Sequence, residues 1–353
     1  MGAIGKPFQK MRRRLTVTGS SGNAENVDGR SDSKDFDAEQ EQELQQQAER
    51  RARKAAKQNA KMGQPTARCA VTDYCGVSKK GHAPYNPRKK NQDSLIMAND
   101  PATNSLVLCV LDGHGEHGDG VSQSFRDTLA TEMFNHPAWA TDLQTATADA
   151  IAKCERNLLR NYRIDTEFSG TTLSMAIVRG NHVTGVNIGD SRVILAKEEN
   201  GRMVAQDITF DHKPDSPKEK ERILGCGGRV FAVEYDDGID GPPRVWLGHM
   251  DIPGLAMSRS LGDVVAHSAG VTSEPEFTEF DLNPAKDKFL VVATDGLWEF
   301  VENQETVDMV EGQQVPADAV EFLVTEAATR WMHEEQVIDD TTIIVANLFD
   351  YKS

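Results

Sequence analysis

Two apolar runs that each end in Asp-Gly most strongly limit the folds open to this chain of 353 residues. Residues 106–111 are all apolar and lead into Asp112-Gly-His-Gly, and residues 289–293 lead through a threonine into Asp295-Gly. Apolar runs of this length predict buried strands. An acid placed where a core strand ends needs a partner, because an unpaired buried charge is costly, and a hard cation is the obvious one. A plain surface turn is the alternative for either run taken alone.

The same pattern recurs more weakly at two other places. Asp190 follows the run at 185–189, and Asp339-Asp340 comes just before the apolar run at 342–346. Strands of one sheet could bring the ends that carry these distant acids together. Oxygen ligands alone suit Mg²⁺ or Mn²⁺ rather than zinc, and a pair of such ions activates a water in many phosphoester hydrolases.

Six motifs, in the same order along the chain, resemble those of the metal-dependent Ser/Thr protein phosphatases of the PP2C (PPM) family. They are Asp112-Gly-His-Gly, Ser169-Gly-Thr-Thr, Gly189-Asp-Ser-Arg, Ser258-Arg-Ser-Leu-Gly-Asp263, Thr294-Asp-Gly-Leu-Trp298 and Asp339-Asp-Thr-Thr342. The resemblance covers roughly residues 65–350. It implies an α+β fold, a four-layer α-β-β-α sandwich of two antiparallel sheets, with the metal centre in a cleft at one edge. Independently, strands in two groups with helices after each predict face-to-face sheets with helices outside.

The resemblance also implies a set of metal ligands for two Mg²⁺ or Mn²⁺ ions. Asp112 would bridge both ions, and the Gly113 carbonyl would complete one coordination shell. Asp295 would act together with Asp339. Asp340 fills a position usually held by Asn, so the choice between the adjacent acids at 339 and 340 stays open.

The resemblance extends to two further acids. Many family members carry Glu-Asp where this chain has Gln92-Asp93, so Asp93 is expected to take the acidic role, directly or through water. Asp190 resembles a residue that helps to hold a third, weaker ion in some members. The alternative for Asp190 is a turn acid that is hydrogen-bonded to neighbouring amides.

Two residues resemble the family's catalytic groups. Arg88, four residues before Gln92, matches a phosphate-binding arginine, whose guanidinium fork fits phosphate oxygens two at a time. His114 matches the proposed general acid that protonates the leaving Ser or Thr oxygen. The implied reaction is hydrolysis of phosphoserine or phosphothreonine by direct attack of a water that bridges the two cations. The alternatives are a solvated basic run at 88–90 and a pseudophosphatase that binds phosphoproteins.

The charge and the cysteines of the chain limit the partners and the cellular compartment that we expect. The net charge is −16, but residues 1–62 carry 13 Lys and Arg against 9 Asp and Glu, which leaves −20 for the rest. An acidic body argues against nucleic acid as a general partner. The five cysteines include no Cys-x-x-Cys pair, so neither a disulfide framework nor a zinc site is indicated, and a reduced cytoplasmic or nuclear setting is expected. Phosphoprotein substrates and a monomeric state are expected.

The first 62 residues form a separate basic tail followed by a charged helix or linker. Residues 1–36 are polar and predict disorder, and residues 37–62 run from acids to bases, which suits a solvated helix. The sequence Met1-Gly2 suggests acylation of Gly2, although Lys6 stands where the usual motif has Ser or Thr. A basic cluster at 6–14 is the second signal that a single acyl chain needs for stable attachment. Peripheral membrane contact, or a membrane-tethered adaptor, follows as an alternative.

Periodicity in the folded part predicts helices at 121–164, 217–224, 304–310 and 316–332. Glycine, proline and acidic residues make 225–254 loop-rich, and the resemblance implies that this stretch is a variable flap beside the active site. These elements complete the expected phosphatase domain at 65–350.

Overall fold

The computed structural model describes residues 61–63, 69–235, 238–349 and 351–352. The predicted acylation of Gly2, basic cluster at 6–14 and disorder to residue 36 all lie outside the described residues. So does nearly all of the helix predicted at 37–62. Its last two residues are described and contradict that prediction, because Lys61 and Met62 form part of a short strand that pairs with Gly76 and Cys75.

Six antiparallel strands form the first sheet. Their spatial order is β1 (Lys61–Gly63), β2 (Val71–Lys79), β17 (Thr341–Leu348), β16 (Asp287–Ala293), β9 (Arg192–Glu199) and β10 (Arg202–Asp207). Buried side chains alternate between the two faces: Ile343 and Val345 of β17 pack on one side, and Ile344 packs on the other. Because both faces are buried, the strand reads as a continuous apolar run.

Five antiparallel strands form the second sheet. Their order is β15 (Glu276–Asp281), β8 (His182–Ile188), β7 (Leu173–Arg179), β4 (Ser105–Leu111) and β3 (Ser94–Asp100). Leu106 and Leu108 of β4 join the core that lies between the two sheets, whereas Val107 and Cys109 face the opposite side. The sheets therefore pack face to face through one central core.

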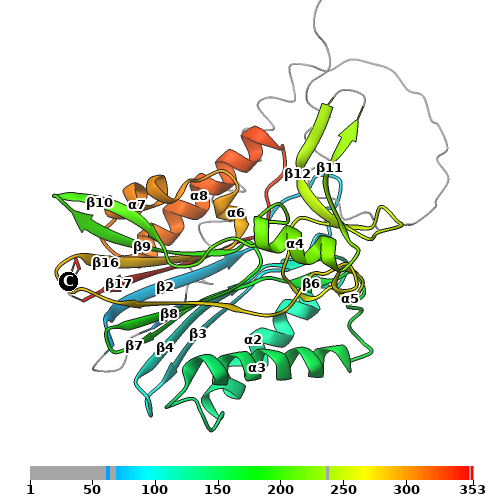
Figure 1. Ribbon diagram of the computed structural model, residues 1–353. Helices are drawn as coiled ribbons and strands as arrows, with labels where there is room; N and C mark the ends of the chain where they lie inside the picture. The colour runs from blue at the N-terminus through cyan, green and yellow to red at the C-terminus, as the bar shows by residue number, and fades with distance from the viewer. Residues whose placement is uncertain (1–60, 64–68, 236–237, 350, 353) are drawn as a thin grey trace, which may run out of the picture.

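Helices cover the two outer faces. The five-stranded sheet carries α2 (Gly118–Phe134) and α3 (Leu143–Leu159), and the six-stranded sheet carries α6 (Asp295–Trp298), α7 (Asn303–Glu311) and α8 (Pro316–Glu334). Figure 1 shows α7 and α8 on one side of the stacked sheets and α2 and α3 on the other. The predicted four-layer α-β-β-α sandwich is confirmed. The helical stretch predicted at 121–164 is two helices, with a break at 135–142 and an end at Leu159.

The stretch predicted to be loop-rich contains a β-hairpin. After α4 (Pro217–Gly225), strands β11 (Arg229–Tyr235) and β12 (Gly238–Trp246) pair antiparallel, and β12 also pairs with β13 (Pro253–Leu255). This hairpin projects beside α4 in Figure 1. A small apolar cluster that includes Ile223, Val245 and Leu255 fixes its base. The hairpin is a structured appendage rather than an irregular loop.

Three very short strands lie close to the sequence motifs. They are β5 (Gly113–His114), β6 (Gly170–Thr171) and β14 (Leu261–Gly262), in the order β14-β6-β5, and α5 (Val264–His267) follows β14. Through this small sheet, three of the six motifs become neighbours although they are about 60 to 150 residues apart in the chain.

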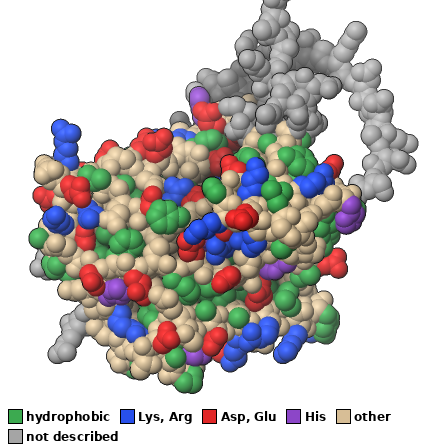
Figure 2. Space-filling view, in the orientation of Figure 1, with side chains coloured by type: hydrophobic (Ala, Val, Ile, Leu, Met, Phe, Trp, Pro, Cys, Tyr) green, Lys and Arg blue, Asp and Glu red, His purple; other side chains and the backbone are tan. Residues whose placement is uncertain are grey.

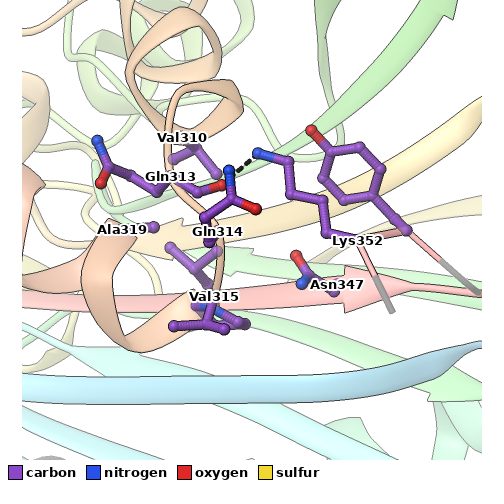
Figure 3. A pocket seen from close by; sticks show the side chains of 10 residues that line it. Val310, Gln313, Gln314, Val315, Ala319, Asn347 and Lys352 are labelled. Carbon is purple, nitrogen blue, oxygen red and sulfur yellow. Dashed lines mark hydrogen bonds between the residues drawn. The ribbon is translucent and has the colours of Figure 1, made fainter.

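The chain end packs against the helical layer of the six-stranded sheet. Lys352 Nζ donates to the backbone carbonyls of Glu311 and Gln313 at the end of α7, and Tyr351 packs on Phe289 with ring centroids 5.6 Å apart. Figure 3 shows Lys352 reaching toward the backbone at Gln313. The hollow drawn there is lined by Val345 and Asn347 of β17, at the opposite end of that strand from Asp339 and Asp340.

Among the described residues, no helix combines the length and apolar character needed to span a bilayer.

Candidate metal centre and active site

Asp112 lies between β4 and β5, where it is held through its backbone. Its amide donates to Thr172 Oγ1 at 3.1 Å, and its carbonyl accepts from the Thr172 amide at 2.9 Å. A Cβ on the following Gly113 would lie 2.4 Å from the carbonyl oxygens of Gln92 and Gly118, so only glycine fits there. The turn is therefore fixed by contacts on both sides, and the Asp112 side chain takes no part in holding it.

Asp93 connects three strand ends. Its Oδ2 accepts from Thr294 Oγ1 at 2.9 Å and from Thr342 Oγ1 at 2.8 Å. Thr294 directly precedes Asp295, and Thr342 directly follows the 339–341 segment. Asp93 is 6% exposed, yet its second oxygen, Oδ1, is buried without a hydrogen-bond partner among the described residues. A buried carboxylate oxygen with no donor is unusual unless a ligand completes it.

The acids at these strand ends act on one another electrostatically. The pKa of the Asp112 carboxyl is raised well above its ordinary value, first by burial and then by the negative charges of Asp295, Asp93 and Asp339. The pKa of Asp93 is raised in the same way, by burial and by Asp340. Carboxyl groups that lie close together and are poorly solvated favour their neutral, protonated form. A cation bound among them would instead favour the ionised form. The structure thus brings four predicted ligands, Asp93, Asp112, Asp295 and Asp339, within reach of each other.

The adjacent acids Asp339 and Asp340 have different surroundings. Asp340 accepts hydrogen bonds from the amides of Gly81 at 2.7 Å and Gln92 at 2.9 Å, and it also pairs with Lys89. These donors use both of its oxygens. Asp339 is more exposed, and it is the one whose charge raises the pKa of Asp112. The surroundings therefore favour Asp339 over Asp340 as a ligand and give Asp340 the task of fixing the 81–92 loop.

In the described part of the chain, no three His, Cys, Asp or Glu side chains converge on a single point as ligands. The acids lie close enough to affect one another electrostatically and form an open set. The donor set still fits a hard divalent cation, because it consists of carboxylate oxygens, one of them without a donor. An ion held there would take the rest of its shell from water or backbone carbonyls, as Mg²⁺ commonly does.

Asp190 lies at the turn after β8 and is paired with a cation from the chain itself. Lys213 Nζ donates to Asp190 Oδ2 at 2.8 Å. Burial alone would lower the pKa of Lys213, but Asp190 and Asp211 outweigh it and raise that pKa. The charge of Asp190 also reaches His114. The structure places Asp190 beside the acidic set, and its carboxylate already has one positive partner.

His114 is bound to an acid that was not predicted as a site residue. Its Nε2 lies 2.6 Å from Asp263 Oδ2. Burial alone would lower the pKa of the imidazole, but Asp263, with added effects of Asp190 and Asp295, outweighs burial and raises the pKa. Asp263 ends the Ser258 motif, so the motif was the one sequence signal that pointed to it.

Arg88 and Gln92 lie on the loop that ends at Asp93. Arg88 is exposed in a turn closed by a hydrogen bond from Lys89 N to Asn86 O, and among the described residues its guanidinium forms no ion pair. Gln92 donates through Nε2 to the Gly115 carbonyl at 2.6 Å. Gln92 therefore ties two loops of the site together, a role that a carboxylate could not fill because it has no donor.

Hollows found elsewhere in the molecule do not coincide with the acids. The hollow of Figure 3 lies at the far end of β17. A larger groove of about 380 Å³ lies between the C-terminal end of α2 and the middle of α3, beside His136 and Lys153. Figure 2 shows acidic and basic side chains interleaved over one face, without a broad area of a single charge. The chemistry-bearing residues are concentrated at the strand ends and loops described above.

Comparisons with known proteins identify the family to which the chain is similar. The family model for protein phosphatase 2C matches residues 78–335. A probable protein phosphatase 2C 35 of Arabidopsis thaliana is 32% identical over 292 residues, covering 78% of this chain and 83% of the relative. A probable protein phosphatase 2C 64 of Oryza sativa subsp. japonica is 37% identical over 268 residues, covering 72% of this chain and 61% of the relative.

A solved structure supports the fold. The serine-threonine phosphatase 2C of Toxoplasma gondii superposes with a TM-score of 0.68 at 22% identity, covering 82% of this chain and 99% of that chain. The sandwich has the fold of that phosphatase, and the acids gathered at its strand ends offer a place for a divalent metal. The chain belongs to the protein phosphatase 2C family and is a protein phosphatase. Membership implies dependence on a divalent metal.

Proposed function

We propose that this protein hydrolyses phosphoserine and phosphothreonine in protein substrates, using two divalent cations, Mg²⁺ or Mn²⁺. The observation that carries the proposal is the gathering of Asp93, Asp112, Asp295 and Asp339 at strand ends, where their charges oppose each other. Asp93 Oδ1 accepts no hydrogen bond from the described residues. Such an arrangement is costly for an empty fold and favourable for one that binds cations.

Each site residue has a separate role in the proposed reaction. Asp112 would hold both ions, with Asp93, Asp295, Asp339 and the Gly113 carbonyl as further ligands. When bound, the cations supply Lewis acidity, which lowers the pKa of an attacking water and offsets the phosphate charge. Arg88, exposed on the loop that leads to Asp93, binds and orients the phosphate oxygens. His114 donates a proton to the Ser or Thr oxygen as the bond to phosphorus breaks.

The experiment is phosphate release from a phosphothreonine peptide, with and without Mn²⁺, after the protein has been stripped of metal by a chelator. Wild type, Asp112→Ala, Asp295→Ala and Arg88→Ala are compared. The matched control is Asp281→Ala, which removes an exposed acid whose carboxylate lies 2.8 Å from His182 on the protein surface. We expect Mn²⁺-dependent turnover in the wild type and control, none above background for the two ligand variants, and a raised KM for Arg88→Ala.

Two results would oppose the proposal. Full turnover by the metal-stripped protein would remove the cations from the mechanism. Binding of the peptide without turnover at any Mn²⁺ concentration would instead identify a pseudophosphatase, which is the second reading of the sequence.

A further inference from the structure

The partly buried His114 and the buried Asp263 form a pair between residues that are 149 positions apart in the chain. The distance of 2.6 Å between Nε2 and Oδ2 is short for a nitrogen–oxygen hydrogen bond, as expected where one partner is charged. The Asp263 side chain is 4% exposed. The other ring nitrogen, Nδ1, is buried and has no hydrogen-bond partner among the described residues. Nε2 is therefore committed to the carboxylate, which is the one side chain bonded to the ring among the described residues.

The local structure is built to hold the Asp263 carboxylate in this place. Asp263 has φ 42°, the left-handed region that non-glycine residues rarely occupy. Its amide donates to the Ser169 carbonyl at 3.0 Å. A Cβ on Gly170 would lie 2.1 Å from Asp263 Oδ2, so a larger residue at 170 would displace the carboxylate. The strained backbone and the glycine both serve the position of this one side chain.

The Asp263 carboxylate does not cap a helix. Asp263 stands at the N-cap position of α5, where an aspartate ordinarily bonds the first free amides of the helix. Its side chain makes no such bond and reaches to His114 instead. Helix capping therefore does not account for the residue.

We propose that Asp263 is a positioning residue for His114. The carboxylate accepts the Nε2 proton and fixes the ring in the orientation from which the protonated imidazole gives a proton to the leaving oxygen. In the reaction, water oxygen forms a bond to phosphorus and the bond from phosphorus to the Ser or Thr oxygen breaks. That oxygen takes a proton from the imidazolium. One proton of the attacking water stays on the product phosphate, the other passes to solvent, and solvent returns a proton to the imidazole. This inference rests on the proposed function.

The test compares two substrates on one enzyme preparation. A phosphothreonine peptide has a poor leaving group that needs a proton, whereas 4-nitrophenyl phosphate has a good one that does not. For Asp263→Asn we expect kcat to fall by about 10²-fold on the peptide, within the range of general acid catalysis, and by less than about threefold on the aryl phosphate. Asparagine tolerates the left-handed backbone at this position. Because both substrates are assayed together, their ratio does not depend on the folded fraction.

Three further variants make the outcome decisive. Asp281→Asn removes the charge of the exposed acid bonded to His182. We expect it to leave kcat unchanged on both substrates. His114→Ala should reproduce the substrate-selective loss, and the double variant His114→Ala, Asp263→Asn should be no slower than His114→Ala alone. Equal losses on both substrates for Asp263→Asn, or fully additive losses in the double variant, would overturn the positioning role. A wild type without Mn²⁺-dependent peptide hydrolysis would overturn the proposed function instead.

Discussion

Two groups of carboxylates in this protein have neighbours of opposite charge. Glu219, on α4 at the base of the hairpin, accepts from Arg259 at 2.9 Å, Arg222 at 2.9 Å and Ser258 Oγ at 2.6 Å. Burial would raise its pKa, but these partners outweigh burial and hold it well below the ordinary value. At the strand ends, Asp93 and Asp112 face other acids, and their pKa values are raised.

The difference separates a structural acid from a ligand-binding one. A buried carboxylate surrounded by guanidinium and hydroxyl donors is satisfied by the fold and stabilises it as it stands. A set of carboxylates facing each other is satisfied only when something outside the chain joins it. Burial alone does not distinguish the two, because Glu219 and Asp93 are 5% and 6% exposed. The identity of the neighbours does.

The largest effect is expected from Asp112→Asn, which breaks the acidic set. Peptide hydrolysis should fall at least about 10³-fold, since several kcal/mol of transition-state stabilisation depend on the bound cations. The melting temperature of the metal-free protein should nevertheless rise by roughly 2 °C, because one of several opposing charges is gone. Activity assays and thermal melts after chelation measure both. A lower melting temperature of the metal-free variant would show that Asp112 is structural, like Glu219.

We expect Glu219→Ala to lower the free energy of unfolding strongly without acting directly on the metal site. Removing one partner of a buried ion network costs up to about 5 kcal/mol; Arg222 and Arg259 keep some solvent exposure, so we expect roughly 2–4 kcal/mol. Urea unfolding gives the value, and Mn²⁺ affinity should be unchanged. Weakened Mn²⁺ binding with unaltered urea unfolding would contradict the contrast between the two groups.

The pH dependence of stability should differ in sign between the two groups. Asp93 and Asp112 have raised folded-state pKa values, so the metal-free protein loses stability as pH rises above about 4, the ordinary pKa of Asp. Glu219 has a lowered pKa, and its stabilisation is lost as pH falls below its ordinary value. Because Mn²⁺ needs the ionised acids, the gain in melting temperature on adding Mn²⁺ should be larger at about pH 8 than at about pH 5.5. An equal gain at both pH values would count against cation binding by these carboxylates.

The smallest effect is expected at Asp190, which combines features of both groups. Lys213→Met removes the partner 2.8 Å from its carboxylate, and a partly exposed ion pair of this kind contributes at most about 1 kcal/mol. We expect up to about a fivefold gain in affinity for the weakest Mn²⁺ site, because Asp190 is freed to bind a cation. Calorimetric titration measures it. Unchanged Mn²⁺ affinity would place Asp190 with the structural acids.

The layers of the fold could be predicted from sequence because the core strands are buried on both faces. Strand β4 reads as an unbroken apolar run for that reason. Strands β10 and β15 were missed because they lie at sheet edges and carry mostly half-exposed, polar side chains. The hairpin of β11 and β12 was read as loop because its glycines, prolines and acids mask the strand pattern.

The site could be predicted only as far as local patterns reach. Acids that follow apolar runs, such as Asp112 and Asp295, carry their own signal. Partners that act across the fold do not: nothing near Lys213 in the sequence announces its contact with Asp190, and Asp263 was visible only as the end of a motif. The choice between Asp339 and Asp340 depends on which one the amides of Gly81 and Gln92 occupy, and that is a property of the folded loop.

The central claim is that the opposed acids exist to bind divalent cations. Calorimetric titration of Mn²⁺ into chelator-stripped wild type, Asp112→Asn and Glu219→Ala tests it most directly. The account predicts about two ions bound per wild-type chain, the same for Glu219→Ala, and loss of at least one for Asp112→Asn. Equal Mn²⁺ binding by wild type and Asp112→Asn, or none by the wild type, would contradict it.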